Sequence, residues 1–197
     1  MLKHDGLWWP DSDKIAHKII PGFARQSFPR VEKYFKGRKL ALQAGGNIGL
    51  YPMLLAGQFK KVLTFEPDPE NYRCLRKNCK QPNVKARMLA LGNRNGTVNL
   101  IPNRRNTGAH KTTDDLGNTG VITIDSLQLE TCDLIWLSVN GFNMEVLAGT
   151  ERTIERFRPV MILAETSDDK PEARNWLIER GYKVREKVPL RDYVMTC

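Results

Sequence analysis

The feature that most constrains the fold is a glycine-rich turn at residues 42–52, LQAGGNIGLYP, which lies between two short apolar segments. The apolar run 39–44 before the turn predicts a strand, and residues 50–58 after it have the pattern of a helix. A second strand is predicted at 61–65, and Glu66 follows it directly. A strand, a glycine turn, a helix and a second strand that ends in an acid are typical of the nucleotide-binding half of a Rossmann-like fold.

The rest of the chain continues this alternation of strands and helices. A helix is predicted to begin at Pro69 with Asp68 as its N-cap, because proline is favoured at the first helical position. The remaining patterns predict strands at 84–91, 97–101, 121–124, 133–139, 159–164, 182–188 and 193–197, and helices at 144–157 and 172–180. The alternation implies an α/β fold with a doubly wound, mainly parallel sheet, and the strand-rich end suggests an antiparallel edge strand.

Two segments do not fit the alternation. Residues 1–37 are interpreted as an irregular N-terminal arm with a helix that opens at Ser27, and the main domain is expected to span 38–197. In this arm the run WWP, residues 8–10, could form an aromatic lid over a pocket, or it could simply pack against the domain. Residues 102–120 are polar and rich in glycine and asparagine, which predicts a long loop.

The glycine turn and the acid after it together suggest a ligand. Gly45 and Gly49 would let the backbone approach it, and Glu66 lies 21 positions after Gly45, where a carboxylate can accept hydrogen bonds from both hydroxyls of a ribose. The spacing GGNIG is one residue shorter than GxGxxG, whose helix end binds a pyrophosphate. An adenosyl ligand without a diphosphate, above all S-adenosylmethionine, is therefore favoured over NAD. The alternatives are a glycine turn without a ligand and an exposed Glu66 beside a helix start.

Four segments of the chain are similar, in order and spacing, to one family of enzymes. AGGNIGLYPMLLA, VLTFEPDPENYRCLRKN, CDLIWLSVNGFNMEVLAGTERTI and RPVMILAE resemble the FkbM family of methyltransferases from about Leu40 to Glu165, and QAGGNIGLYP resembles members carried by phages. The resemblance implies the Rossmann-like class I methyltransferase fold with a seven-strand sheet. It also implies S-adenosylmethionine as the cofactor and O-methylation of a sugar or another small molecule as the activity.

The resemblance also implies a set of cofactor-binding residues. In this sequence they are Gln43, Gly45, Asn47, Gly49, Glu66, Asp68, Ala90 and Leu91. Family members usually have an acid where Gln43 stands, and this acid helps to hold the methionine end of the cofactor. Glutamine can still donate and accept hydrogen bonds, but it lacks the charge that attracts an amino group. Alternatively, Gln43 is only a polar residue at the end of a strand.

The positions that correspond to the family's catalytic acids are also changed. Where the family typically reads K-I-D-V-E-G, this chain reads WLSVNG at 136–141, so Ser138 and Asn140 are the predicted catalytic positions. Neither side chain can act as a general base or bind a metal at neutral pH without help, although Asn140 could orient an acceptor. Glu145 and Glu165 could supply the missing carboxylate, or they could be surface or capping residues. A binding or structural protein with impaired catalysis is therefore the alternative to an active enzyme, and no metal site is predicted.

The charge of the chain bears on its partners. The net charge is +9, but the basic residues are spread along the chain, so a solvated surface is favoured over a nucleic-acid footprint. The sequence also lacks the (D/N)PP(Y/F/W) signature of amino methylation on bases. We therefore expect a small-molecule acceptor, for which a saccharide is one option, and we leave a homo-oligomer open.

Hydropathy and cysteine content bear on the location of the protein. No apolar run approaches the roughly 20 residues needed to cross a bilayer, and the N-terminus lacks a hydrophobic signal core. The chain has four cysteines without a CxxC pair, which suggests reduced thiols. The predicted location is the cytoplasm, or the host cytoplasm if a phage encodes the protein.

Overall fold

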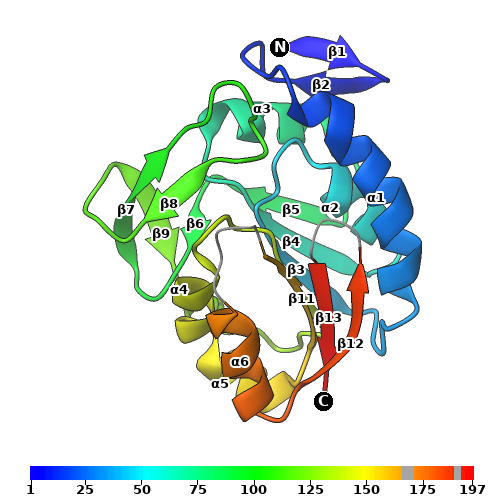
Figure 1. Cartoon of the computed structure of the whole chain (residues 1–197), viewed down its shortest axis with the longest axis vertical. Coiled ribbons are helices and arrows are strands. Elements are labelled where there is room, and N and C mark those ends of the chain that lie inside the picture. The colour runs from blue at the N-terminus through cyan, green and yellow to red at the C-terminus, as the bar shows by residue number, and fades with distance from the viewer. Residues whose placement is uncertain (166–170, 189–191) are drawn as a thin grey trace.

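The main body of the protein is a seven-stranded sheet with helices on both faces (Figure 1). The computed structural model describes residues 1–165, 171–188 and 192–197. In sheet order the strands are β12 (Lys183–Val188), β13 (Asp192–Thr196), β11 (Val160–Ala164), β10 (Leu134–Leu137), β3 (Leu40–Ala44), β4 (Lys61–Phe65) and β5 (Val84–Arg87). Among these described strands β13, next to the edge, is the one that runs opposite to all the others, and β3 pairs with β10 at the centre. The expected doubly wound, mainly parallel α/β sheet is confirmed.

Helices cover both faces of the sheet, and this explains why the central strands are apolar along their whole length. The helices are α1 (Ala16–Glu32), α2 (Leu50–Ala56) and α3 (Pro69–Asn78) on one side, and α4 (Asn143–Ala148), α5 (Glu151–Phe157) and α6 (Glu172–Glu179) on the other. Side chains of β10 alternate between the two cores: Trp136 packs with residues of α1 and α2, and Leu137 packs with residues of α4, α5 and α6. A strand buried on both faces needs apolar residues at every position.

A second, four-stranded sheet lies beside the main sheet, and the sequence patterns did not predict it. Its order is β6 (Ala90–Leu91), β9 (Thr119–Ile122), β7 (Gly96–Ile101) and β8 (Lys111–Thr113). The single strand expected at 84–91 is wrong, because β5 and β6 belong to different sheets. The long loop expected at 102–120 is also wrong in part, since it contains β8 and the start of β9. β8 is short and polar and pairs through its backbone at an edge, so its side chains give no strand pattern.

The N-terminal region is regular, so the expectation of an irregular arm is wrong. A hairpin of β1 (Leu2–His4) and β2 (Leu7–Trp9) precedes α1, which begins at Ala16 and not at Ser27. The Ser27 hydroxyl donates to the carbonyl of Phe23 inside the helix. Pro21 and Pro29 lie within α1 and made its periodic pattern look interrupted.

The helix expected at 144–157 is two helices, α4 and α5, separated at Gly149. A Cβ atom at Gly149 would lie 1.9 Å from the carbonyl oxygen of Gly92, so only glycine fits where the chain turns against the second sheet. The new helix is capped from elsewhere in the chain. Asp125, which begins the short 3-10 helix η1 (Asp125–Leu127), accepts the backbone N–H groups of Arg152 and Thr153.

The expected cap of α3 is confirmed. The carboxylate of Asp68 accepts the backbone N–H groups of Glu70 and Asn71, and Pro69 occupies the first turn.

None of the described helices has both the length and the apolar composition that crossing a membrane would require.

Candidate functional site

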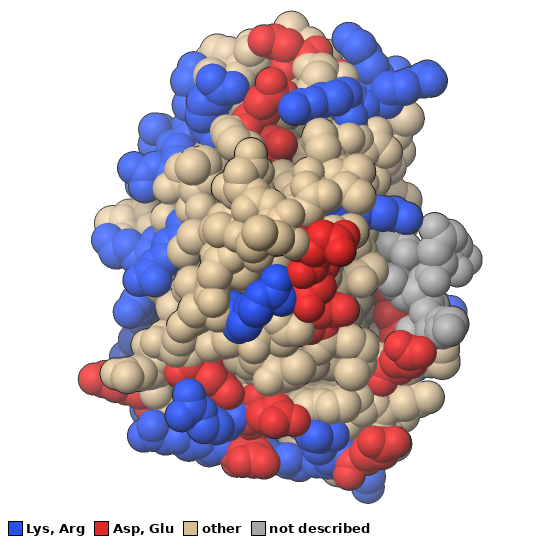
Figure 2. Space-filling model, turned by 90° about the vertical axis from the view of Figure 1, so that its left-hand side faces the viewer, with Lys and Arg blue, Asp and Glu red and all other residues tan. Residues whose placement is uncertain are grey.

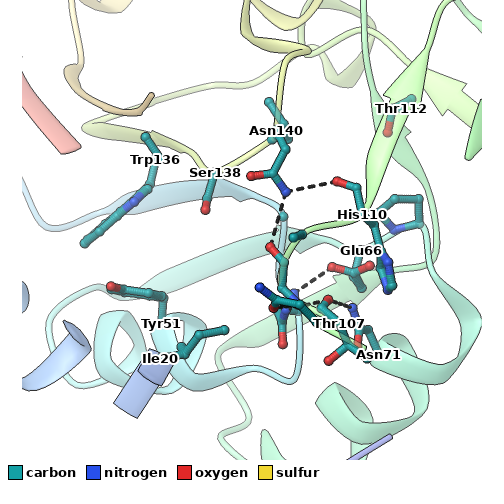
Figure 3. A pocket seen from close by; sticks show the side chains of 18 of the residues that line it. Ile20, Tyr51, Glu66, Asn71, Thr107, His110, Thr112, Trp136, Ser138 and Asn140 are labelled. Atoms are coloured by element: carbon teal, nitrogen blue, oxygen red, sulfur yellow. Dashed lines mark hydrogen bonds between the residues drawn. The ribbon is translucent and has the colours of Figure 1, made fainter. Parts of the chain in front are cut away.

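A cavity of about 520 Å³ opens at the carboxyl ends of the central strands. Side chains from α1 and α2, the glycine turn and residues 106–110 complete its walls. Figure 3 shows Ile20, Tyr51 and Trp136 on one side of this cavity and Glu66 and His110 on the other. Parallel α/β sheets bind ligands at this edge, where strand order reverses, and the volume is in the usual range for small-molecule sites.

The floor of the cavity is the last row of the sheet on the side covered by α1 and α2. Strand registers place Glu66, Gly45, Ser138, Ala164 and Asp192 side by side across β4, β3, β10, β11 and β13, and all five line the cavity. Neighbouring strands lie about 4.8 Å apart, so the four steps of this sheet order separate the two ends of the row by about 19 Å. We call these ends the Glu66 end and the Asp192 end.

The Glu66 carboxylate is buried and held in one orientation. Its two oxygens accept the backbone N–H groups of Asn47 at 2.6 Å and of Asp68 at 2.9 Å. Burial raises the pKa of Glu66 to about 7, and the two N–H donors act in the opposite direction. A carboxylate oxygen has room for more than one hydrogen bond, so Glu66 can still accept bonds from a ligand in the cavity.

The N–H groups of the glycine turn are already used within the protein. Those of Gly45 and Gly46 both donate to the carbonyl oxygen of Phe65, at 3.0 and 2.9 Å. The N–H of Asn47 donates to Glu66, and that of Ile48 donates to the Asn47 side chain. A pyrophosphate is bound by free N–H groups at such a turn. The turn therefore suits a ligand without a diphosphate.

The two predicted cofactor glycines have different environments. Gly45 lines the cavity, has a φ of +81°, and would place a Cβ 2.1 Å from the carbonyl oxygen of Ser138. Gly49 has a φ of +97° and does not line the cavity; a Cβ there would lie 2.6 Å from Sγ of Cys79. Gly45 thus permits close approach of β3 and β10 at the floor of the cavity, whereas Gly49 permits close packing of the turn on α3.

Three other predicted cofactor positions lie beside the cavity and not in its wall. Gln43 is buried, donates to the carbonyl of Gly45 at 2.7 Å and accepts the Thr64 hydroxyl at 2.6 Å, so its amide fastens the turn to β4. Ala90 and Leu91 line a hollow of about 20 Å³ that shares Gly45 with the cavity. An effect of Gln43 on a cofactor would therefore act through the position of the turn.

Residues 103–110, which we call the strap, form a further wall of the cavity. The Asn47 and Asn71 side chains both donate to the carbonyl of Thr107, at 3.0 and 2.8 Å. Asn140 donates from Nδ2 to the carbonyls of Gly108 at 3.2 Å and His110 at 2.9 Å (Figure 3). The strap is thus fastened by asparagine side chains that reach it from three separate segments.

The N-terminal region also holds the strap. The buried carboxylate of Asp13 accepts the N–H and the hydroxyl of Thr107, both at 3.2 Å, and the N–H groups of Ala16 and His17 at the start of α1. Trp8, by contrast, donates its backbone N–H to the Asn78 side chain on α3, and neither tryptophan of the WWP run lines the cavity. Of the two alternatives for that run, packing against the domain is the one observed.

The two predicted catalytic positions lie at the middle of the cavity. Ser138 lines the floor, and Asn140 lines the wall beside the strap. Because both bonds of Asn140 are donated to carbonyl oxygens, an acid at this position could not make them. Asn140 therefore positions the strap in this chain and is not a general base.

His110 lines the cavity, although it belongs to none of the motifs found in the sequence. Its Nδ1 accepts the backbone N–H of Asn103 at 2.8 Å, so the neutral ring carries its proton on Nε2. Nε2 lies 3.7 Å from Oδ2 of Asp68. Burial lowers the pKa of His110, and the Asp68 carboxylate acts in the opposite direction.

Two carboxylates lie toward the other end of the cavity. Of the two positions considered for a missing acid, Glu165 lines the cavity and Glu145 does not. Oε2 of Glu165 lies 3.7 Å from the guanidinium of Arg174. Asp192 lines the cavity as well and is buried, and this burial raises its pKa to about 7. Asp192 was missed because only the pairing of β13 with β11 brings it beside Ala164.

The cavity differs in charge from the rest of the molecule. The described residues that line it include no lysine or arginine, but they include three acids, Glu66, Glu165 and Asp192. The net charge of the chain is positive. On the face in Figure 2, Lys and Arg gather along one edge, both signs mix at the two ends, and the mostly uncharged middle holds one basic and one acidic group side by side. A cavity of this kind suits neutral or cationic ligands.

Comparison with known proteins identifies the family. The model of the methyltransferase FkbM domain matches residues 43–184, whereas no curated protein sequence matches significantly. The solved methyltransferase FkbM from Methylobacillus flagellatus KT is similar at a TM-score of 0.56 and 16% identity, over 80% of this chain but only 42% of that one.

Two further solved structures share the fold. The ribosomal protein L11 methylase from Lactobacillus delbrueckii subsp. bulgaricus has a TM-score of 0.55 and 10% identity, over 89% of this chain and 78% of that one. TrmK from M. capricolum, in complex with S-adenosyl-homocysteine, has a TM-score of 0.50 and 9% identity, over 86% and 66% of the two chains. The class I methyltransferase fold is confirmed, and the chain belongs to the FkbM methyltransferase family.

Proposed function

We propose that the protein is an S-adenosylmethionine-dependent methyltransferase that methylates a hydroxyl group of a small molecule, for example a saccharide. The observation that carries this proposal is the Glu66 carboxylate, which is buried, oriented by two backbone N–H groups and directed into the cavity at the tip of β4. A carboxylate in this place accepts hydrogen bonds from both hydroxyls of a ribose.

The residues around Glu66 fit an adenosyl cofactor. Gly45 lets the ligand lie against the strand ends, and the turn offers no free N–H groups for a diphosphate. Ala90 and Leu91 would border the base, with Asn47 and Asp68 holding Glu66 in place. When bound, the cofactor supplies an electrophilic methyl group.

The reacting region lies at the middle of the floor. Two strand steps of about 4.8 Å place Ser138 about 10 Å from Glu66, which is within the reach of an extended adenosyl ligand. Alignment of the acceptor contributes most to methyl transfer. Asn140 supports that alignment through the strap. Glu165, just beyond β11, is the cavity carboxylate that we assign to take the proton from the acceptor hydroxyl.

The free cysteines bear on the location of the protein. Free thiols at Cys74, Cys79, Cys132 and Cys197 support a reducing compartment such as the cytoplasm.

A protein without activity, which the loss of acids at Ser138 and Asn140 suggested, is less favoured, because Glu165 restores a carboxylate to the cavity.

Transfer of a labelled methyl group tests the proposal. Purified protein is incubated with methyl-labelled S-adenosylmethionine and a panel of saccharides and small alcohols with and without an amino group, beside Glu165→Gln and the control Glu145→Gln outside the cavity. We expect transfer to at least one hydroxyl compound, a drop of about 10²-fold in Glu165→Gln, and no change in the control. Cofactor binding without transfer to any hydroxyl compound would instead support the binding protein.

A further inference from the structure

The Asp192 end of the cavity is separate from the end that suits the cofactor. The row of strand ends places Asp192 four strands from Glu66, and about 19 Å away. Tyr51 and Trp136 line the cavity with their ring centroids 4.7 Å apart, and Figure 3 shows both, with Ile20, on the side away from Glu66. Tyr51 is also within electrostatic reach of Asp192. A ligand that extends from Glu66 to the middle of the floor leaves this apolar compartment for the acceptor.

The three carboxylates that line the cavity in the described part of the chain differ in how they are compensated. Glu66 accepts two backbone N–H groups, and Glu165 lies 3.7 Å from Arg174. Asp192 is only 5% exposed, and within the described part of the chain no group donates a hydrogen bond to its side chain or forms an ion pair with it. Its charge still reaches Tyr51, whose pKa is raised to about 12 by burial and, to a smaller extent, by Asp192.

An uncompensated carboxylate inside an apolar compartment is unfavourable unless a ligand supplies the opposite charge. The protein has 31 Lys and Arg against 22 Asp and Glu, yet no lysine or arginine is among the described residues that line this cavity. Among the described residues, an anionic acceptor such as a phosphorylated sugar would therefore meet three carboxylates and no basic side chain. A cationic group would find the partner that Asp192 lacks.

We propose that Asp192 binds an ammonium group of the methyl acceptor, which makes the acceptor an amine-bearing small molecule. The proposal rests on the proposed function, since it assigns the acceptor of the same site. The raised pKa of Asp192 agrees with it, because a carboxyl that is half ionised near neutral pH ionises fully once a cation lies beside it. In this role Asp192 binds the acceptor and takes no part in the transfer itself.

Three probes of one size test the proposal: benzylamine, benzyl alcohol and benzoate. Each is titrated into the protein with and without saturating S-adenosylhomocysteine, and binding is followed by protein NMR shifts. We expect benzylamine to bind at least 10-fold more tightly than benzyl alcohol, and benzoate to bind weakest. Asp192→Asn should lower benzylamine affinity to that of the alcohol and leave S-adenosylhomocysteine affinity within 2-fold. The matched control is Asp115→Asn, at an exposed position outside the cavity.

Other results would overturn the assignment. Equal binding of amine and alcohol, tighter binding of benzoate, or no binding of any probe by the wild type would each do so, even if Asp192→Asn did not fold. An amine preference that persists in a folded Asp192→Asn variant would do so as well. Failure to bind S-adenosylhomocysteine would count against the proposed function alone, because the amine preference is also measured without it.

Discussion

Replacing Asn140 with aspartate exchanges a hydrogen-bond donor for an acceptor of the same shape. Asn140 donates to two strap carbonyls, those of Gly108 at 3.2 Å and His110 at 2.9 Å. Each lost bond removes about 1 kcal/mol, and a carboxylate facing two carbonyl oxygens adds about 1–2 kcal/mol of repulsion and desolvation. The total of roughly 3–4 kcal/mol favours the open strap, which corresponds to a roughly 10²- to 10³-fold increase in local opening.

Hydrogen exchange of the strap amides measures this opening. In Asn140→Asp the amides of residues 103–110 should exchange about 10²-fold faster than in the wild type, while those of β3 and β10 should not change. Ser138→Asp is the control, because it adds a carboxylate to the same cavity without touching a bond of the strap. If the exchange rates of the strap amides in Asn140→Asp stay within 3-fold of the wild type, Asn140 does not hold the strap closed.

This result also bears on the two acids that the family has and this chain lacks. From the sequence alone, an acid at Ser138 and at Asn140 would be expected to restore a general base and to raise turnover. The hydrogen bonds of Asn140 predict the opposite for that position, because an acid there releases the wall of the cavity. The asparagine that replaces the family's acid at position 140 therefore suits the strap of this chain, because it donates the hydrogen bonds that hold the strap.

Asp192→Asn should raise the free energy of unfolding by about 2–4 kcal/mol at pH 8 and leave it nearly unchanged at pH 4. The reason is that folding raises the pKa of this carboxyl from 3.8 to about 7. Its ionisation therefore destabilises the fold as the pH rises through that window. Urea denaturation at both pH values measures the difference, and an effect independent of pH would contradict it. Asp13→Ala should lower the free energy of unfolding by about 2–4 kcal/mol, since Ala16, His17 and Thr107 lose their acceptor; thermal denaturation checks it, and a loss under 0.5 kcal/mol would argue against the contact. Binding of duplex RNA should be weak and vanish near physiological salt, as fluorescence anisotropy can test, and tight, salt-resistant binding would refute a merely solvated basic surface.

The parts of the fold that local sequence determines were predicted well. Strand β3, the glycine turn, α2 and β4 follow one another within 26 residues, and Asp68 caps α3 by accepting N–H groups close to it in the chain. The central position of β10 also follows from its sequence, because a run of apolar residues at every position suits a strand covered on both faces. These features depend on residues that are close in the chain.

The parts that depend on distant residues were not predicted. Pro21 and Pro29 concealed α1, and β8 forms through backbone pairing that its polar side chains do not reveal. The same holds for the site. Asn140 and the strap meet across 30 residues, and Asp192 reaches the cavity only through its register with β11. A spacing rule that relates a glycine turn to an acid cannot report such contacts.

The central claim, that Glu66 holds the ribose of an adenosyl cofactor, is tested most directly by calorimetric titration with S-adenosylhomocysteine. The wild type and the control Glu145→Gln should bind with equal affinity, and Glu66→Gln should bind about 30- to 150-fold more weakly, since it loses about 2–3 kcal/mol of charge-assisted hydrogen bonding. Circular dichroism establishes that the variant is folded. No binding by the wild type, or equal binding by a folded Glu66→Gln variant, would contradict the assignment.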